Sequence, residues 1–401
     1  MDRIVVVGAG QAGSSLVAKL RNLGHDGPIT LIGEEGTPPY QRPPLSKKYL
    51  LGEMDLERLY LRPETFYADE DIALMIDARV EEIDRVGKSV IVNGEPLPYD
   101  HLALTTGSIP RRLPASVGGD LDDVYVVRTL ADVDAMAPAC REGARMLVVG
   151  GGYIGLEAAA VAAKLGLQVT VIEMAERILQ RVACRETSDY FRNLHRSHGV
   201  DIRENVGLTR LIGDGHVSAA VLNDGSELPV DIVVAGIGIT PATGLAEAAG
   251  LTIENGIWTN SHGRTSDASI WAAGDCASLP YNGGRIRLES VQNAIDQAEC
   301  VAANMLGADK EYMPYPWFWS DQYDTKLQIA GLNTGYDRVV TRGSGDAVSF
   351  WYYAGARLLA VDALNDGRAY MVGKRLIEMG KSPPPDMVSD AKTDLKPLLK
   401  A

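Results

Sequence analysis

The feature that most constrains this fold is a short pattern that the chain contains twice. In each copy an apolar, β-branched run leads into a Gly-x-Gly-x-x-Gly turn, and a helical stretch and a second apolar run follow. The expected strands are residues 4–7, 29–32, 145–149 and 168–172, and the expected helices reach residue 23 in the first copy and span 156–165 in the second. Two such units predict an α/β chain with two Rossmann-like dinucleotide-binding domains.

The spacing of the glycines has a physical cause. The first glycine allows the tight turn, the second lets the backbone approach a pyrophosphate, and the third lets the helix pack on the strand. The free N–H groups at the start of the helix then face the phosphates. The glycines concerned are Gly8, Gly10 and Gly13 in the first turn and Gly150, Gly152 and Gly155 in the second.

An acidic residue follows each unit at the distance that a ribose requires. Glu34 lies 21 residues after Gly13, and Glu173 lies 18 residues after Gly155. A carboxylate about 20 residues after the last glycine can accept hydrogen bonds from a ribose diol. One glycine turn alone would be weak support for a nucleotide site. Two complete units predict FAD at one site and a nicotinamide nucleotide at the other.

Composition excludes several other classes of protein. Hydrophobic residues make up 46% of the chain and charged residues 23%, as in globular proteins that bury large cores. The net charge of −14 argues against general binding to nucleic acids or anionic membranes. The four cysteines form no Cys-x-x-Cys pair, which agrees with a reducing compartment. No apolar run approaches the ~18 residues that cross a bilayer and no signal segment is recognised, so a cytoplasmic protein is expected.

The last third of the chain has a different pattern. Short apolar runs separated by glycine and aspartate follow Trp317-Phe318-Trp319, as in an antiparallel sheet with hairpin turns. A helix is expected over residues 367–379. In a strand Trp317 and Trp319 face the same side, where core packing is the default for aromatic rings. These features predict a separate C-terminal α+β domain.

The order of the motifs resembles one family along nearly the whole chain. Besides the two glycine turns, the motifs begin at Tyr40 (YQRPPLSK), Thr105 (TTG), Ala235 (AGIG), Ala272 (AAGD), Glu289 (ESVQ) and Pro316 (PWFWSDQ). With this order and spacing the chain resembles the ferredoxin reductases of bacterial oxygenase and cytochrome P450 systems. They form the putidaredoxin-reductase-like branch of the two-dinucleotide-domain FAD flavoproteins.

The resemblance implies a fold and an activity. It implies a glutathione-reductase-like arrangement, with an FAD-binding domain at residues 1–110 and 236–315, an NADH-binding domain at 111–235 and a C-terminal interface domain at 316–401. The implied enzyme is an NADH:ferredoxin oxidoreductase. Electrons would pass from NADH through flavin N5 to a [2Fe–2S] ferredoxin, which feeds a P450 or a ring-hydroxylating dioxygenase.

The resemblance also assigns residues to the site. Lys47 would lie near the isoalloxazine ring and pair with Glu157 where the nicotinamide enters, and we expect these two residues to be catalytic. The other cofactor-binding residues implied are Ala12, Glu34, Val80, Arg128, Asp275 and Val291 for FAD, together with the six turn glycines, Glu173, Gly238 and Trp319, the last in a shielding or stacking role. No metal ligand is implied.

The absence of a redox-active cysteine argues against thiol-dependent redox chemistry. Thiol-dependent relatives carry a redox-active cysteine pair, or a single cysteine near the position of Tyr40, whereas no cysteine precedes Cys140 here. Reduced flavin is therefore expected to pass its electrons singly to an external carrier. Two alternatives stay open at this point. One is an NADH–rubredoxin reductase, and the other is a redox-sensing flavoprotein resembling apoptosis-inducing factor.

Two groups of charged or titratable residues need an interpretation. His195 and His198 lie three residues apart, and we interpret them as part of a solvated helical face rather than as metal ligands, because no cysteine or third histidine is near. An acidic reductase needs a local basic surface to bind an acidic ferredoxin. The candidates for that surface are Arg285, Arg287 and Lys326.

Overall fold

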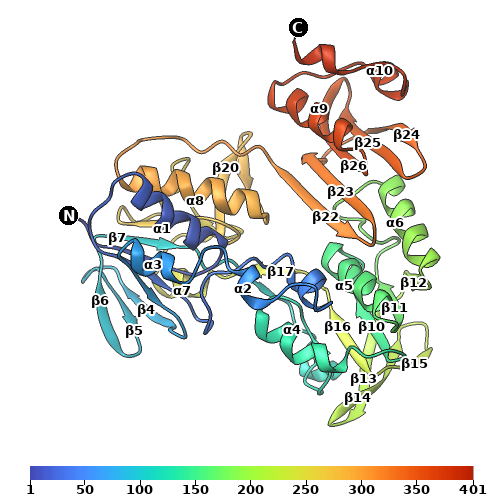
Figure 1. Cartoon of the computed structure of the whole chain (residues 1–401), viewed down its shortest axis with the longest axis horizontal. Helices are drawn as coiled ribbons and strands as arrows, with labels where there is room; N and C mark the ends of the chain where they lie inside the picture. The colour runs from blue at the N-terminus through green and yellow to red at the C-terminus, as the bar shows by residue number, and fades with distance from the viewer. Residues whose placement is uncertain (401) are drawn as a thin grey trace. The chain divides into compact units, whose positions relative to one another are not determined.

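The computed structural model describes residues 1–400 and separates into two compact units (Figure 1). Unit 1 contains Met1–Arg42, Asp55–Ile109 and Ile239–Pro314. Unit 2 contains Pro43–Met54, Pro110–Gly238 and the chain from Tyr315 onward. Each unit is assembled from segments that are distant in the sequence.

Unit 1 is built on a parallel five-stranded sheet with the strand order β19-β7-β1-β2-β3. Its strands are β1 (Ile4–Val7), β2 (Ile29–Ile32), β3 (Ile72–Met75), β4 (Val80–Asp84), β5 (Ser89–Val92), β6 (Glu95–Pro98), β7 (His101–Leu104), β8 (Ser108–Pro110), β17 (Ile239–Pro241), β18 (Ile257–Trp258), β19 (Ile270–Ala272), β20 (Ala277–Tyr281) and β21 (Gly284–Ile286). Its helices are α1 (Gln11–Asn22), α2 (Leu56–Leu59), α3 (Thr65–Asp69), α7 (Gly244–Ala248) and α8 (Val291–Met305).

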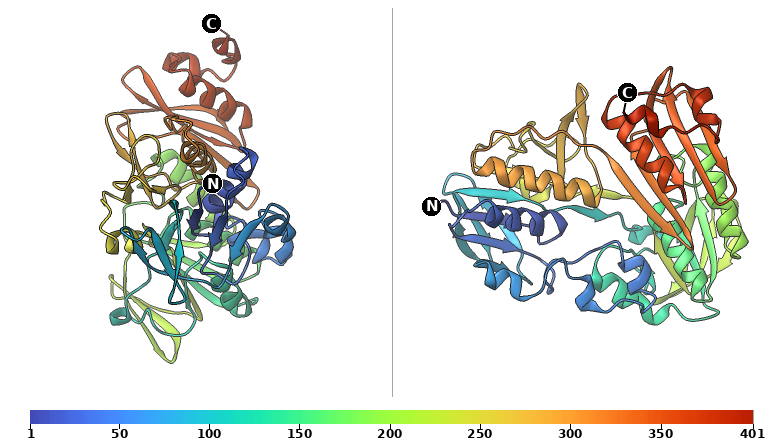
Figure 2. Two further views of the ribbon diagram at one scale, coloured as in Figure 1. Left: turned by 90° about the vertical axis from the view of Figure 1, so that its left-hand side faces the viewer. Right: turned by 45° about the horizontal axis from the view of Figure 1, so that its top comes forward.

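Two layers cover the sheet of unit 1. Side chains alternate along β1, so Ile4 and Val6 pack with α1 and α8, whereas Val5 and Val7 pack against the small antiparallel sheet β4-β5-β6. Helices α1 and α8 lie side by side on their face of the sheet (Figure 2). Because both faces are covered, β1 reads in the sequence as a continuous apolar run.

Unit 2 contains a second parallel five-stranded sheet, with the order β12-β11-β10-β16-β9. Its strands up to residue 238 are β9 (Val124–Tyr125), β10 (Arg145–Val149), β11 (Gln168–Glu173), β12 (Asp201–Glu204), β13 (Leu208–Asp214), β14 (His216–Leu222), β15 (Glu227–Pro229) and β16 (Ile232–Ala235). Its helical segments there are Leu45–Tyr49, Ala115–Val117, α4 (Leu130–Met136), Ala137–Ala139, α5 (Tyr153–Lys164) and α6 (Arg185–Ser197). Strand β10 lies between β11 and β16, as β1 lies between β2 and β7, so each glycine turn follows a strand flanked on both sides.

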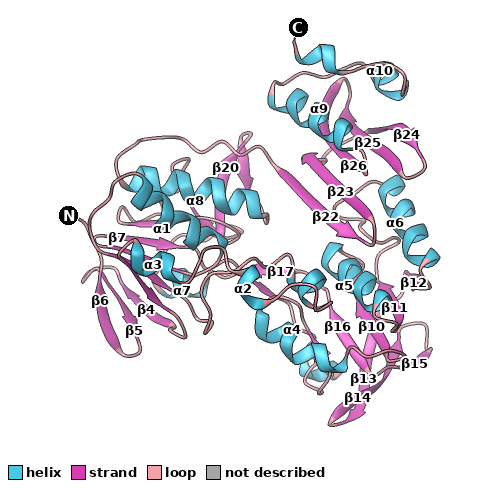
Figure 3. Ribbon diagram, in the orientation of Figure 1, coloured by secondary structure: helices cyan, strands magenta, loops and turns pink. Residues whose placement is uncertain are grey.

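The C-terminal part of unit 2 is an antiparallel sheet with the order β22-β23-β26-β25-β24, against which α9 packs (Figure 3). Its strands are β22 (Trp317–Gln322), β23 (Thr325–Gly331), β24 (Arg338–Ser344), β25 (Ala347–Ala354) and β26 (Arg357–Leu364). Its helical segments are α9 (Gly367–Glu378), α10 (Pro385–Ser389) and Lys396–Leu399.

The expected fold class is confirmed. Two parallel sheets carry the glycine units and an antiparallel α+β part follows, and the four strands of the glycine units form where they are expected. The helix expected from Leu156 begins earlier, at Tyr153, because Gly152 serves as its N-cap residue. The division into three domains stays a prediction.

One carboxylate is buried in the C-terminal sheet. Asp362 of β26 is completely buried, and its Oδ2 accepts hydrogen bonds from Tyr352 and from Thr187 of α6, the latter at 2.8 Å. Among residues 1–400 its Oδ1 has no hydrogen-bond partner. Burial raises the pKa of Asp362 to about 6.

We expect the Asp362→Asn variant to be more stable than the parent at neutral pH. Folding favours the protonated acid, so the cost of burying the carboxylate is absent below about pH 4 and grows as the pH rises through about 6. The difference between this pKa and the ordinary value of 3.8 corresponds to about 3 kcal/mol. Urea unfolding followed by circular dichroism should show a gain of this order at about pH 8 that disappears near pH 4. An equal gain at both pH values would contradict this expectation.

Candidate functional site

The first glycine turn, between β1 and α1, contains one glycine that the protein itself does not require. Gly8 has a φ of +115°, and a Cβ there would lie 2.2 Å from the carbonyl oxygen of Thr105. A Cβ on Gly13 would lie 2.0 Å from the carbonyl oxygen of Gly8. At Gly10, by contrast, a Cβ would meet no atom within 4 Å, and its φ of −97° is open to any residue. Gly10 therefore leaves free surface at the start of α1.

The second glycine turn, between β10 and α5, repeats this arrangement. Gly150 has a φ of +107°, and a Cβ there would lie 2.4 Å from the carbonyl oxygen of Gly236. A Cβ on Gly155 would lie 2.3 Å from the carbonyl oxygen of Gly150. Gly152 again has free space around the position of a Cβ and a φ of −80°. In both turns the outer glycines are needed for packing, whereas the middle one is not.

The helices that begin at these turns have uncapped N-termini. Helix α1 starts at Gly10 and α5 at Gly152, with no side-chain cap and no acidic residue in the first turn. Helices α4, α8 and α9 are instead capped by the side chains of Thr129, Ser290 and Asp366. An uncapped N-terminus presents free N–H groups and a partial positive charge to an anion. The residues present in each turn thus fit the pyrophosphate of a dinucleotide.

The two predicted ribose ligands differ in their surroundings. The carboxylate of Glu173 accepts hydrogen bonds from the backbone N–H groups of Gly151 and Ala175, both at 2.8 Å, and so lies against the second turn. Glu34 is largely exposed and lies 3.6 Å from Arg79. Glu173 is therefore held in place by the backbone, whereas Glu34 forms an exposed ion pair.

Lys47 and Glu157, the predicted catalytic residues, form a buried ion pair within unit 2. Lys47 Nζ lies 2.6 Å from Glu157 Oε2, and the two side chains are 19% and 7% exposed. The lysine also donates to the carbonyl oxygen of Pro43 at 3.3 Å. Ser46 donates to the same glutamate oxygen at 3.3 Å, and Ser320 donates to Oε1 at 2.7 Å. Both oxygens of the carboxylate are thus occupied by donors from two different segments.

The spacing of side chains along α5 matches the spacing along β22, and this explains how Ser320 reaches Glu157. Tyr153 and Glu157 lie one helical turn apart on α5, about 6 Å along its axis. Phe318 and Ser320 lie two residues apart on β22, about 6.8 Å along the strand. The two spacings agree closely, so the Tyr153 and Phe318 rings meet at 5.2 Å while Glu157 meets Ser320.

Ser320 is a site residue that the sequence reasoning missed. It lies within the Trp-Phe-Trp-Ser-Asp-Gln motif, of which only the aromatic residues were assigned a role from the sequence. The available signal was a small polar residue directly after three aromatic residues, on the strand face opposite to Trp317 and Trp319. A polar side chain placed there needs a buried partner.

Two predicted FAD ligands, Ala12 and Asp275, lie close together after the end of β19 in unit 1. Asp275 accepts a hydrogen bond from Ser108 at 2.9 Å. Gly274 lies next to α1, because a Cβ there would be 3.1 Å from the Cβ of Ala12. Val291 is the first residue of α8, directly after the capping Ser290. Their role in binding FAD stays a prediction.

The remaining predicted cofactor residues lie in separate places. Val80 is buried in β4 of unit 1. In unit 2, Arg128 precedes α4 and its backbone N–H donates to Asp132 at 3.2 Å. Gly238 follows β16 with a φ of +98°. Trp319 is half-buried, and its ring lies 5.6 Å from that of Trp317, so the two tryptophans do share one face of β22.

Two interpretations of charged or titratable residues need correction, and together they concern three residues. His195 does not belong to a solvated face, because its side chain is completely buried. Arg285 and Arg287 are poor candidates for a docking surface, since their side chains are only 17% and 13% exposed. Arg285 donates to the carbonyl oxygen of Thr259 at 2.8 Å and Arg287 pairs with Glu289. Both guanidinium groups therefore form hydrogen bonds or ion pairs with other residues of unit 1.

The thiols are unsuited to redox chemistry. All four cysteines are free, and only Cys140 is not buried. Burial raises the pKa of Cys140 and of Cys184 to about 11. Because the thiolate is the reactive form, such thiols are inert near neutral pH.

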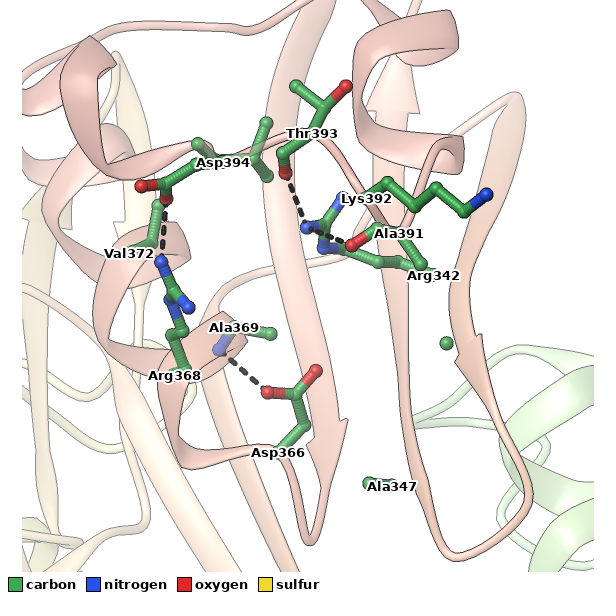
Figure 4. A pocket seen from close by; sticks show the side chains of 12 residues that line it. Arg342, Ala347, Asp366, Arg368, Ala369, Val372, Ala391, Lys392, Thr393 and Asp394 are labelled. Atoms are coloured by element: carbon green, nitrogen blue, oxygen red, sulfur yellow. Dashed lines mark hydrogen bonds and ion pairs between the residues drawn. The ribbon is translucent and has the colours of Figure 1, made fainter.

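A hollow of about 310 Å³ lies beside α9 and β24 in unit 2 (Figure 4). Two of its cationic side chains, those of Arg342 and Arg368, form hydrogen bonds within the protein. Arg342 donates to the carbonyl oxygens of Asp390 and Thr393, both at 2.7 Å, and Arg368 pairs with Asp394 at 2.7 Å. No predicted site residue lines the hollow, so it is not part of the candidate site.

Two further kinds of feature are absent from residues 1–400. No helix in this range has both the length and the apolar character needed to span a bilayer. In the same range no group of three or more histidine, cysteine, aspartate or glutamate side chains is arranged to bind a metal ion.

Known families match almost the whole chain. The pyridine nucleotide-disulphide oxidoreductase family matches residues 2–298, and the reductase C-terminal family matches residues 317–399. Rhodocoxin reductase of Rhodococcus erythropolis is 41% identical to this chain, over 98% of the chain and 93% of the relative.

Two solved structures are similar to both units. The ferredoxin reductase for the CYP199A2 system from Rhodopseudomonas palustris is 40% identical, with a TM-score of 0.96 and full coverage of both chains. The reductase in the covalent putidaredoxin reductase–putidaredoxin complex is also 40% identical, with a TM-score of 0.96 over 100% of this chain and 98% of the other. Sequence, fold and glycine turns agree, and the chain belongs, with these ferredoxin reductases, to the pyridine nucleotide-disulphide oxidoreductase family.

Proposed function

We propose that this chain is an NADH-dependent ferredoxin reductase that holds FAD as its resident cofactor. When bound, FAD supplies the ring that accepts a hydride from the nicotinamide at N5 and releases the two electrons one at a time. The acceptor is a [2Fe–2S] ferredoxin, which feeds an oxygenase of the P450 or ring-hydroxylating type. The enzyme works in the cytoplasm.

The observation that carries this proposal is the pair of open glycine positions. Neither Gly10 nor Gly152 needs to be glycine for the protein's own packing or backbone conformation. Both stand at uncapped helix starts, where a pyrophosphate binds. Two such places in one chain suit two dinucleotides, and in an oxidoreductase without reactive thiols these are FAD and NADH.

The side chains take the roles that the resemblance implies. Glu173 accepts hydrogen bonds from the adenosine ribose of NADH, and its negative charge disfavours the 2′-phosphate of NADPH. Glu34, with Ala12 in the first turn, holds the ADP half of FAD, and Asp275 binds its ribityl chain. Lys47 and Glu157 are the catalytic pair.

The proposed domains are those that the resemblance implies. The FAD-binding domain comprises residues 1–110 and 236–315, the NADH-binding domain comprises 111–235, and the C-terminal interface domain comprises 316–401. The division of the described chain into two units separates the first glycine turn from the second, which supports two nucleotide-binding domains. The same division places Pro43–Met54 with the second turn and does not separate the C-terminal part from it.

The choice of a one-electron carrier rests on two observations. The four cysteines are all free and three of them are buried, so they offer no second two-electron site, and the electrons leave the protein from the flavin. Several relatives of similar length are named ferredoxin reductases, and a similar reductase has been solved joined to its putidaredoxin, although a rubredoxin-NAD(+) reductase is also among the relatives.

Anaerobic titration tests this function. We expect about one NADH per FAD to reduce the flavin completely, because FAD is the only two-electron site, and we expect NADPH to react far more slowly. A [2Fe–2S] ferredoxin added next should reoxidise the flavin. The matched controls are the four single Cys→Ser variants, each of which should titrate like the parent.

Other outcomes would identify other functions. A requirement for two equivalents of NADH would reveal a second redox centre. Reoxidation by rubredoxin but not by ferredoxin would identify a rubredoxin reductase. Flavin reduction without turnover on any one-electron acceptor would identify a redox sensor.

A further inference from the structure

A line of polar side chains runs from Glu157 to the turn after β22. The Ser320 hydroxyl lies 2.7 Å from Glu157 Oε1, and Gln322 Nε2 lies 3.2 Å from Ser320 Oγ. Gln322 Oε1 lies 2.8 Å from His195 Nε2, and the Tyr323 hydroxyl lies 3.3 Å from His195 Nδ1. Ser320, Gln322 and His195 are at most 1% exposed. Water is thus excluded from the middle of this line, which we call the Ser320–His195 line.

The direction of every hydrogen bond in the Ser320–His195 line follows from which groups can donate a proton and which can only accept one. A carboxylate oxygen only accepts, so the single hydroxyl proton of Ser320 goes to Glu157. Gln322 must then donate to Ser320 through Nε2, which turns its carbonyl oxygen toward His195. That oxygen also only accepts, so His195 carries a proton on Nε2. Burial lowers the pKa of His195 to about 4, so the ring is neutral and Nδ1 is left as an acceptor.

The fold holds both ends of this line. Ser320 and Gln322 lie on one face of β22, and His195 projects from the last turn of α6. Tyr323 begins the following turn with a φ of +56°, a conformation that bulky residues rarely adopt. Its ring stacks on that of His198 at 3.7 Å and meets the His195 ring edge-on at 5.1 Å. These contacts explain why tyrosine occupies a position where glycine or asparagine is usual.

We propose that Ser320, Gln322 and His195 are positioning residues for the Lys47–Glu157 pair. They keep Glu157 Oε1 turned toward Ser320, which leaves Oε2 for Lys47. The charge of Glu157 in turn sets the tautomer of His195 through three successive hydrogen bonds. The effect on hydride transfer rests on the proposed function, whereas the direction of the line is a property of the fold alone.

The Glu157→Gln variant gives the sharpest test, because it should invert the whole line. Lys47 only donates, so the new amide must turn its oxygen toward Lys47 and its NH₂ group toward Ser320. Ser320 then accepts from residue 157 and donates to Gln322, whose amide must flip. The flipped amide donates to His195 Nε2, so the histidine proton moves to Nδ1.

Nitrogen NMR of the holoenzyme labelled with ¹⁵N-histidine measures this change. Protonated and unprotonated ring nitrogens have well-separated shifts, and the signals of His195 are assigned by their loss in His195→Gln. We expect the Nε2–H tautomer in the parent and the Nδ1–H tautomer in Glu157→Gln. An Nε2–H tautomer in both proteins would overturn the proposal.

Two matched variants test whether the change at residue 157 alters the tautomer of His195 through the hydrogen bonds of Ser320 and Gln322. In Ser320→Ala/Glu157→Gln the missing hydroxyl breaks the line, so the inversion seen in Glu157→Gln should be lost. Ser349→Ala removes another completely buried serine hydroxyl of the same sheet, one that is bonded to Trp351 instead. His195 should keep its parent tautomer in that variant. Inversion in the double variant would overturn the proposed route.

Kinetics test the positioning role itself. Flavin reduction at saturating NADH should be about tenfold slower in Ser320→Ala, because a hydrogen bond to a charged group is lost. The Kd for NADH should stay within about twofold, Ser320→Thr should recover most of the rate, and Ser349→Ala should match the parent. An unchanged rate in Ser320→Ala would overturn the positioning role. If NADH fails to reduce the parent flavin, the proposed function falls, and the nitrogen shifts still decide the direction of the line.

Discussion

Replacing Gly10 with alanine is expected to give a folded protein that loses its FAD. The added methyl group meets no protein atom within 4 Å, so the fold tolerates it. It occupies the surface that the pyrophosphate must approach, however, and a penalty of about 3 kcal/mol weakens FAD binding by about 100-fold. The measurements are the FAD content of the purified protein and a fluorescence titration of the apoprotein with FAD. Circular dichroism verifies the fold.

The other glycines of the two turns supply the controls. Gly152→Ala makes the same change in the second turn and should keep FAD while weakening NADH binding by a similar factor. Gly8→Ala should fail to fold, because its φ is +115° and the new Cβ would lie 2.2 Å from the Thr105 carbonyl oxygen. Normal FAD binding by Gly10→Ala would show that the first turn does not hold the pyrophosphate.

Replacing Lys47 with methionine is expected to destabilise the protein and to slow hydride transfer. Glu157 would be left as a carboxylate that is 7% exposed and has lost its cation. Breaking a buried pair in this way costs about 3 to 5 kcal/mol. Loss of a fixed positive charge at the proposed site should also slow flavin reduction by about 100-fold. Urea unfolding and stopped-flow absorbance measure the two effects separately.

Two comparisons separate the buried charge from other causes. Lys47→Met/Glu157→Gln removes both charges and should recover most of the stability but not the rate. Lys164→Met breaks the pair with Glu53, whose side chains are 57% and 48% exposed, and should cost less than about 1 kcal/mol. Equal destabilisation by Lys47→Met and Lys164→Met would rule out a special role for the buried pair.

The glycine units could be predicted from the sequence because their physics is local. A turn that forces positive φ at Gly8 and Gly150 and close packing at Gly13 and Gly155 can be recognised from residue spacing alone. The strands around them are buried on both faces and therefore read as plain apolar runs. The C-terminal sheet was predictable for a similar reason, since glycine and aspartate mark its turns.

The surroundings of Glu157 could not be predicted in this way. Lys47, Glu157 and Ser320 are separated by 110 and 163 residues, so only the folded chain shows that they meet. The resemblance supplied the pairing of Lys47 with Glu157, but it supplied neither Ser320 nor the hydrogen bonds beyond it. The error on His195 has the same origin, because a polar residue on a helix looks solvated until the strand that covers it is known.

The Ser320–His195 line also limits how this fold can be recombined. Ser320 and Gln322 come from the C-terminal sheet, whereas Glu157 and His195 come from α5 and α6. Neither part can therefore be exchanged without regard to the other. A chimera that receives its last 85 or so residues from a relative must also receive a hydroxyl and an amide at positions 320 and 322. Without them Glu157 and His195 would stay buried but would lose these hydrogen-bond partners. Exchange of C-terminal segments among such reductases is therefore expected to succeed only between partners that match at these positions.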